Sequence, residues 1–234
     1  MWTRKELKEK GKTAFKRNYW KCVLAGFILK LLTDMVARGS GSKKGSLDEF
    51  RAELSAAAAQ AGVSVGTILG ILLGILGISL LISLAINIFV RNPLLVGVNR
   101  FFKENAEEPA TIKEIVYSFS KGRYLKTVGA LVLVNIFVSL WSLLLVIPGI
   151  IKMYEYYMVG YILTDDPDMG VMDALRKSRE MMKGHKWNTF VLNISFIGWK
   201  LLGLITGGIV AIFYVNPYVE ATDAELYLTL KNKG

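Results

Sequence analysis

The sequence predicts an all-α fold: a polytopic membrane protein with six transmembrane helices in three hairpins and amphipathic interfacial helices. Hydrophobic residues make up 53% of the 234 positions and stand in long runs, which suit lipid better than a soluble core. The segment 131–165 contains a long apolar run, a Pro-Gly break and a second apolar run. A similar pattern recurs near the carboxy terminus, and basic residues flank the runs.

The stretch 131–165 is the clearest hairpin. Pro148 and Gly149 are its only strong turn signal, so we expect the chain to enter the bilayer, turn there and return. Aligning 131–165 with 189–223 pairs Asn135 with Asn193 and Gly149 with Gly207, which predicts a second turn at Gly207-Gly208. We infer one integral membrane domain, 1–234, built from repeat units at about 1–103, 109–165 and 166–231.

The amino-terminal unit is the most diverged. Residues 3–17 read as an amphipathic helix capped by Thr3 and Glu6, with Leu7, Ala14 and Phe15 facing lipid. A first span follows at 19–36, then an outer loop at 37–62 and a second span at 63–90. Gly62, Gly66, Gly70 and Gly74 recur every four residues, a spacing that lets another helix approach closely. We expect this stripe to pack within the chain, against a protein partner or in a homo-oligomer.

The later elements follow the same plan. Residues 109–119 predict a second interfacial amphipathic helix, with Thr111 and Glu114 in capping-box spacing. After the first tight hairpin, Asp166 and Pro167 have the spacing of a helix start.

Charge distinguishes between four spans and six. Four spans would place the basic segment 165–186 outside the cell, whereas six place it in the cytoplasm with both termini. The positive-inside rule favours six, although the fourth and sixth spans are short and polar.

The segment PGIIKMYEYYMVGYILTDDPDMGVMDALRKSREMMKGHKWNTFVLNISFIGW, with NPYVEATDAELY after it, resembles an uncharacterised bacterial family of multi-pass membrane proteins, domain of unknown function family 975. The resemblance covers almost the whole chain. Pro148, Gly149, Ala174, Leu175 and Ser178 are also distantly similar to the membrane domain of some glycerophosphodiester phosphodiesterases. The resemblance implies the cytoplasmic membrane of a bacterium and no particular reaction.

Polar residues inside apolar segments are the first site candidates, because they are costly in lipid. They are Asn135, Asn193, Glu155, Asn216 and Glu220. We expect the asparagines at 135 and 193 to hydrogen-bond across the hairpins. A sharper hypothesis places Glu155 and Glu220 in one central cavity that binds a cation or proton, whereas a plainer one pairs Glu155 with Lys152.

A second candidate is a lipid-headgroup site made by Lys183, His185, Lys186 and Trp187, beside which anionic headgroups would gather. The alternative is that these residues only anchor the topology. We expect neither nucleic-acid binding, despite the net charge of +10, nor a metal or other cofactor, since the chain has one cysteine and one histidine.

Catalytic motifs are missing, and Ser178 and His185 lack a nucleophile elbow, so we expect no enzyme. The leading hypothesis is a membrane protein that acts through lipid or partner-protein interaction at the envelope. The alternatives are a small transporter or channel for an ion or amphiphile, and a membrane-embedded lipid-modifying enzyme.

Overall fold

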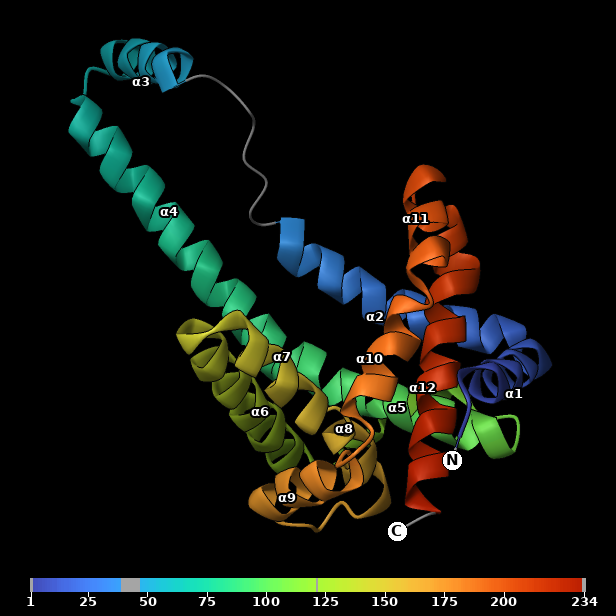
Figure 1. Ribbon diagram of the computed structural model, residues 1–234. Helices are drawn as coiled ribbons and strands as arrows, with labels where there is room; N and C mark the ends of the chain where they lie inside the picture. Colours follow the sequence, from blue (N-terminus) through green and yellow to red (C-terminus); the bar gives the residue numbers. More distant parts are fainter. Residues whose placement is uncertain (1, 39–46, 121, 233–234) are drawn as a thin grey trace. The chain divides into compact units, whose positions relative to one another are not determined.

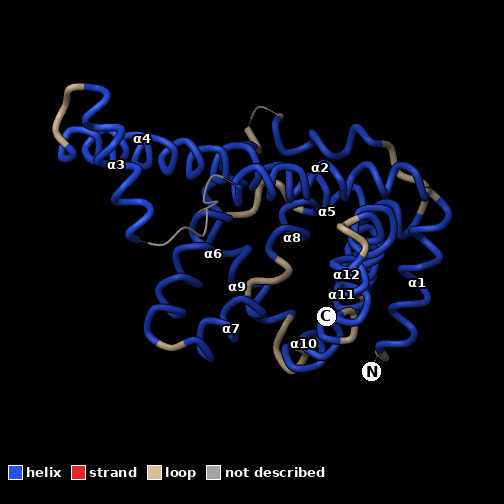
Figure 2. The backbone as a smooth tube through the Cα atoms, turned by 90° about the horizontal axis from the view of Figure 1, so that it is seen from above, coloured by secondary structure: helices blue, strands red, loops and turns tan. Residues whose placement is uncertain are grey.

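The structure is a computed structural model that describes residues 2–38, 47–120 and 122–232. Within these ranges every regular element is a helix (Figures 1 and 2). The α-helices are α1 (Arg4–Arg17), α2 (Tyr19–Arg38), α3 (Leu47–Ala61), α4 (Val65–Ile86), α5 (Asn92–Glu107), α6 (Tyr124–Leu144), α7 (Val146–Glu155), α8 (Val159–Asp165), α9 (Val171–Met181), α10 (Lys186–Ile194), α11 (Ile197–Ile205) and α12 (Asn216–Lys231). The π-helical segments η1 (Asn87–Arg91) and η3 (Ala211–Val215) and the 3-10 helix η2 (Ile112–Phe119) complete the set.

Three described helical stretches are long and apolar enough to cross a membrane: Val65–Glu107, Tyr124–Leu144 and Lys186–Ile205. They correspond to the second, third and fifth predicted spans. The fourth predicted span is divided between α7 and α8, and the sixth begins in η3. The all-helical membrane class is therefore supported, while six spans stay a prediction.

The chain divides into two compact units, of which the larger comprises residues 1–31 and 88–234. Its core forms around α5, which packs against η2, α8, α12, α1 and α6. Phe101 and Phe102 of α5 are almost fully buried there. The crossing of η2 over α5 is so close that a Cβ atom at Gly97 would lie 1.8 Å from the carbonyl oxygen of Ile115. The expected interfacial helix at 109–119 is thus a 3-10 helix packed on protein, and Thr111 makes no side-chain cap.

Helix α1 begins as predicted, because the Thr3 hydroxyl accepts a hydrogen bond from the backbone N–H of Glu6 at 3.2 Å. Its apolar face does not meet lipid, however. Leu7, Ala14 and Phe15 are buried, and α1 packs along α12. This expectation was wrong because an apolar helical stripe has the same spacing whether protein or lipid covers it.

The first tight hairpin joins α6 to α7, but its turn lies earlier than predicted. The chain breaks at Leu145, whose extended backbone (φ −158°, ψ 140°) separates the two helices. Pro148 and Gly149 lie inside the first turn of α7, where a proline is tolerated. A Cβ added at Gly149 would lie 2.7 Å from the Cα of Ser142, so glycine at this position permits the close approach of α6 and α7.

The second tight hairpin, which is the third hairpin of the predicted fold, turns at Gly207 and Gly208, as predicted. Both have positive φ, +62° and +93°. The N–H of Gly208 bonds to the carbonyl of Gly203 and that of Gly207 to the carbonyl of Leu204, the paired bonds of a Schellman cap.

In contrast to the prediction, Asp166 and Pro167 do not begin a helix. Helix α9 starts at Val171, and Asp166 instead accepts the N–H of Asp168 in a turn.

The smaller unit, residues 32–87, contains α3 and the whole apolar helix α4. Gly62 (φ +64°) ends α3, so it does not share a helix face with Gly66, Gly70 and Gly74. Among the described residues of the smaller unit, no heavy atom lies within 4 Å of a Cβ built at Gly70 or Gly74. Close packing of this stripe, within the chain or against a second copy or partner, stays a prediction.

Candidate functional site

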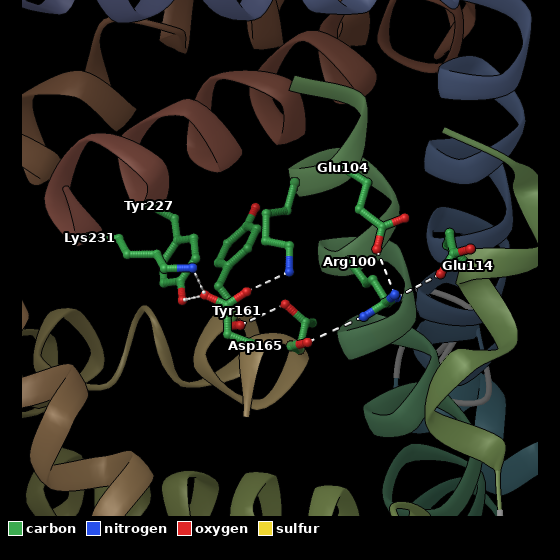
Figure 3. Close-up of polar contacts among 9 residues, drawn as sticks. Arg100, Glu104, Glu114, Tyr161, Asp165, Tyr227 and Lys231 are labelled. Carbon is green, nitrogen blue, oxygen red and sulfur yellow. Dashed lines mark hydrogen bonds and ion pairs between the residues drawn. The ribbon is translucent and has the colours of Figure 1, made fainter. Parts of the chain in front are cut away.

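A network of ion pairs joins the ends of α5, α8 and α12. Asp165, the last residue of α8, binds the ammonium groups of Lys103 at 2.6 Å and Lys231 at 2.7 Å. It also accepts a hydrogen bond from the hydroxyl of Tyr227, and Figure 3 shows Tyr227 and Lys231 beside Asp165. Burial acts to raise the pKa of Asp165, but hydrogen bonds from the two lysines and the tyrosine outweigh it and lower the pKa to about 2.

Arg100 forms the second half of the same network. Its guanidinium lies 2.6 Å from Glu114 of η2 and 2.7 Å from Glu104 of α5, and it donates to the carbonyl of Thr164 at 3.3 Å (Figure 3). Every charge in the network has a partner of opposite sign. We therefore interpret the network as structural: it fixes α5 and η2 to α8.

Glu155 lies in another ion cluster. Its buried carboxylate contacts Lys152 at 2.7 Å, Lys186 at 2.6 Å and Arg179 at 3.4 Å. The predicted pair with Lys152 is thus present. Next to it, the Ser178 hydroxyl donates to the carbonyl of Glu155 and accepts the N–H of Met158, which satisfies the backbone where α7 and α8 are interrupted.

The largest cavity that we describe lies between α1 and α10 and has a volume of about 740 Å³. We call it the α1–α10 cavity. Among the described residues that line it, three are cations and none is an acid. They are Trp2, Thr3, Arg4, Lys5, Lys8, Trp187, Asn188, Val191 and Ser195.

Two side chains of the α1–α10 cavity, those of Trp2 and Lys8, carry hydrogen-bond donors that suit an anion. Trp2 is 6% exposed, and its buried indole N–H has no hydrogen-bond partner in the part of the chain that the structure describes. Lys8 donates to the carbonyl of Ser195 at 3.0 Å and lies over the Phe196 ring. Burial, and after it the charge of Arg4, lowers the pKa of Lys8.

Both π-helical segments directly precede an Asn-Pro pair, Asn92-Pro93 after η1 and Asn216-Pro217 after η3. Proline removes a helical donor and displaces the preceding turn, and π-helical turns are frequent at functional sites. Asn92 lines a second cavity, of about 260 Å³, which we call the α5–α12 cavity. It is lined by Arg91, Asn92, Leu95, Asn99, Leu131, Val134, Asn135, Met153, Tyr156, Tyr157, Gly160, Tyr161, Glu220 and Asp223.

The structure separates several residues that we expected to act together. Glu220 lines the α5–α12 cavity with Asp223, whereas Glu155 is in its own cluster. Asn193 donates weakly to the hydroxyls of Tyr154 and Tyr157, at 3.3 and 3.5 Å, and so does bond across the hairpins. Asn135 lines the α5–α12 cavity, and no hydrogen bond from it to a described residue is found. Asn216 bonds to the Ala211 carbonyl through its backbone N–H.

The predicted headgroup cluster is divided in the same way. Trp187 lines the α1–α10 cavity and is 71% exposed, whereas Lys186 binds Glu155 and Lys183 is exposed. His185 lies beside Trp2, with ring centroids 6.1 Å apart.

Sequence reasoning missed the cavity's cations: Arg4, Lys5 and Lys8 lie in the predicted amphipathic helix at 3–17 and were assigned to no site. The spacing of Arg4 and Lys8, one helical turn apart after a tryptophan, was the available signal.

Comparison with known proteins gives one match. Residues 143–234 match the family model described as "Protein of unknown function (DUF975)". No curated protein and no solved structure matches the chain. The match extends from the end of α6 through α12, a smaller part of the chain than the resemblance implied, and the likeness to a phosphodiesterase membrane domain stays a prediction. Over residues 143–234 the chain is therefore similar to this family of unknown function.

Proposed function

We propose that this is a non-enzymatic integral protein of the bacterial cytoplasmic membrane that acts by binding anionic lipid headgroups at its cytoplasmic surface. In this proposal both termini and α9 are cytoplasmic, and the α1–α10 cavity lies at the level of the headgroups. The bound lipid then serves as the protein's link to the envelope.

One observation supports this most: the α1–α10 cavity brings Arg4, Lys5 and Lys8 together without an acidic residue in its described lining. The unpartnered indole N–H of Trp2 adds a neutral donor for a phosphate oxygen. Trp187, exposed at the rim, has the amphipathic ring that favours the membrane interface.

The test compares the full-length protein with an Arg4→Gln/Lys5→Gln double variant. Neither side chain makes a described hydrogen bond or ion pair, so the fold should persist, whereas Lys8 is left unchanged because it bonds to Ser195. A basic residue near an anionic surface contributes about 1 kcal/mol, so removing two should weaken binding by roughly thirtyfold.

The measurement is calorimetric titration of the protein, in a neutral detergent, with short-chain phosphatidylglycerol and with short-chain phosphatidylcholine. We expect wild type to prefer phosphatidylglycerol and the double variant to lose that preference. Lys12→Gln/Lys16→Gln is the matched control, because it removes the same charge from exposed positions of α1 outside the cavity. Equal affinities for both lipids in wild type, or equal losses in both double variants, would refute the proposal.

A second candidate function, transport of a small ion or amphiphile, is favoured by the α5–α12 cavity, which contains two carboxylates between helices of the larger unit. It predicts that reconstituted vesicles show a flux of such an ion or amphiphile, and that the Glu220→Gln variant lowers this flux. A flux of zero in wild type would eliminate it.

A further inference from the structure

We propose that the α5–α12 cavity binds a small organic cation of the amino-alcohol class, in which an ammonium group and an acceptor oxygen lie a few ångströms apart. This site is separate from the α1–α10 cavity, and the inference does not depend on lipid binding there. It rests on four features of the cavity: charge, aromatic lining, buried donors without partners, and size.

The charge of the lining favours a cation. Glu220 and Asp223 stand three residues apart on α12, and Arg91 is the one cation among the lining residues. The ammonium group of Lys200, which is outside the lining, also acts electrostatically on both carboxylates. Asp223 accepts a hydrogen bond from the Tyr157 hydroxyl at 2.8 Å. No described residue gives the Glu220 carboxylate a hydrogen bond or salt bridge. A sheltered carboxylate without a direct partner is costly unless a cation joins it.

The aromatic lining indicates an ammonium ion rather than a metal. Tyr156, Tyr157 and Tyr161 all line the cavity, and aromatic faces attract organic cations through their electron density. In contrast, no group of three or more His, Cys, Asp and Glu residues that could hold a metal occurs in the described ranges. The volume of about 260 Å³ suits a cation of a few heavy atoms.

Two buried donors supply the second half of the recognition. Among the described residues, the side-chain amide nitrogen of Asn92 and the hydroxyl of Tyr161 have no hydrogen-bond partner, and both residues are 3% exposed. Buried polar groups nearly always have partners, so two such groups in one small cavity indicate that a ligand completes the site. An acceptor oxygen on the cation would satisfy them, which is why the proposal names an amino alcohol.

The site is built where helix geometry changes. Arg91 ends the π-helical segment η1 and Asn92 begins α5, so the widened turn places both at the cavity wall. Such π-helical turns re-aim side chains at functional sites.

The test titrates the full-length protein, in a maltoside detergent, with choline, with tetramethylammonium and with potassium chloride at equal ionic strength. We expect saturable binding of choline, weaker binding of tetramethylammonium, which lacks the oxygen, and none of potassium. Glu220→Gln should lower choline affinity by roughly tenfold or more. Glu225→Gln, a neighbouring carboxylate of α12 outside the cavity lining, is the matched control and should bind as wild type does.

Tyr161→Phe separates recognition from folding. The hydroxyl makes no hydrogen bond to a described residue and the ring stacks on Tyr227, so the phenylalanine variant should fold normally. It should lower choline affinity towards that of tetramethylammonium, because only the Asn92 donor is left, and should not change the affinity for tetramethylammonium. If Glu220→Gln fails to fold, Val134→Phe fills the cavity without altering its charge and should abolish binding of both ions.

The cation could be soluble or part of a lipid headgroup, and one further arm distinguishes the two sources. Phosphatidylethanolamine in nanodiscs should weaken choline binding competitively if the headgroup enters the cavity, and leave it unchanged if the cation is soluble. No saturable choline binding, or equal binding by Glu220→Gln and Glu225→Gln, would overturn the proposal.

Discussion

Replacing Asp165 with asparagine tests the role of the ion network at the end of α8. The substitution keeps the size of the side chain but removes the charge that Lys103 and Lys231 share. Lys103, whose side chain is only 10% exposed, then retains a buried charge without its carboxylate. We expect Asp165→Asn to lower the free energy of unfolding, since breaking a buried pair leaves an uncompensated ion.

The magnitude follows from the pKa of Asp165, which is about 2 against an ordinary 3.8. At 1.36 kcal/mol per pH unit, this difference corresponds to roughly 2.5 kcal/mol. Solvent screening of the partly exposed carboxylate reduces this, so we expect a loss of about 1 to 2 kcal/mol.

The assay is thermal unfolding in detergent, where this loss lowers the midpoint by roughly 2 to 8 °C for a chain of this size. Because the folded-state pKa is depressed, the stabilisation is fully present above pH 4 and disappears as the pH falls towards 2. The two proteins should therefore differ at pH 6 and converge in acid. Asp168→Asn is the control, because its pair with Lys126 is solvent-exposed. Equal midpoints for the two variants at pH 6 would refute the assigned role.

Two further predictions use matched pairs of variants and the same unfolding assay. Gly97→Ala should destabilise the protein by at least about 2 kcal/mol, since the new Cβ would lie 1.8 Å from the Ile115 carbonyl oxygen. Gly74→Ala meets no described neighbour within the smaller unit and should be neutral or stabilising. An unchanged midpoint in Gly97→Ala would mean that η2 does not cross α5 this closely. Lys186→Gln should lower the free energy of unfolding by about 1 kcal/mol, because it removes the pair with the buried Glu155. Lys183→Gln, at an exposed position, should leave the free energy of unfolding unchanged. Equal effects of the two substitutions would contradict the assigned cluster.

Local sequence patterns predicted the helical class, the cap at Thr3 and the turn at Gly207-Gly208, because each depends on residues close together in the chain. The same reasoning misplaced the first turn, since Pro148 is also acceptable in the opening turn of a helix. It assigned the face of Leu7 and Phe15 to lipid, because the spacing of an apolar stripe does not identify what covers it.

The sites were harder to predict because they join distant segments. Lys103 and Asp165 are 62 residues apart, and Lys8 bonds to Ser195 across 187 residues. Trp187 and Glu220 were recognised as unusual one at a time, and only the fold showed their neighbours. Residues such as Trp2 and Asp223 were missed because nothing in their local sequence separates a cavity wall from an ordinary helix face.

Membrane topology is the central claim, because it decides whether the α1–α10 cavity faces the cytoplasm. We would replace Cys22, then introduce single cysteines by Ile147→Cys and Asp168→Cys. The first position is at the α6–α7 tip and 72% exposed, and the side chain of the second is 94% exposed. Gly149 is unsuitable, since a side chain there would meet Ser142. With an impermeant maleimide on intact spheroplasts, the account predicts labelling at 147 and labelling at 168 only after permeabilisation. Labelling at 168 in intact spheroplasts would contradict six spans and place the basic segment before α10 outside the cell.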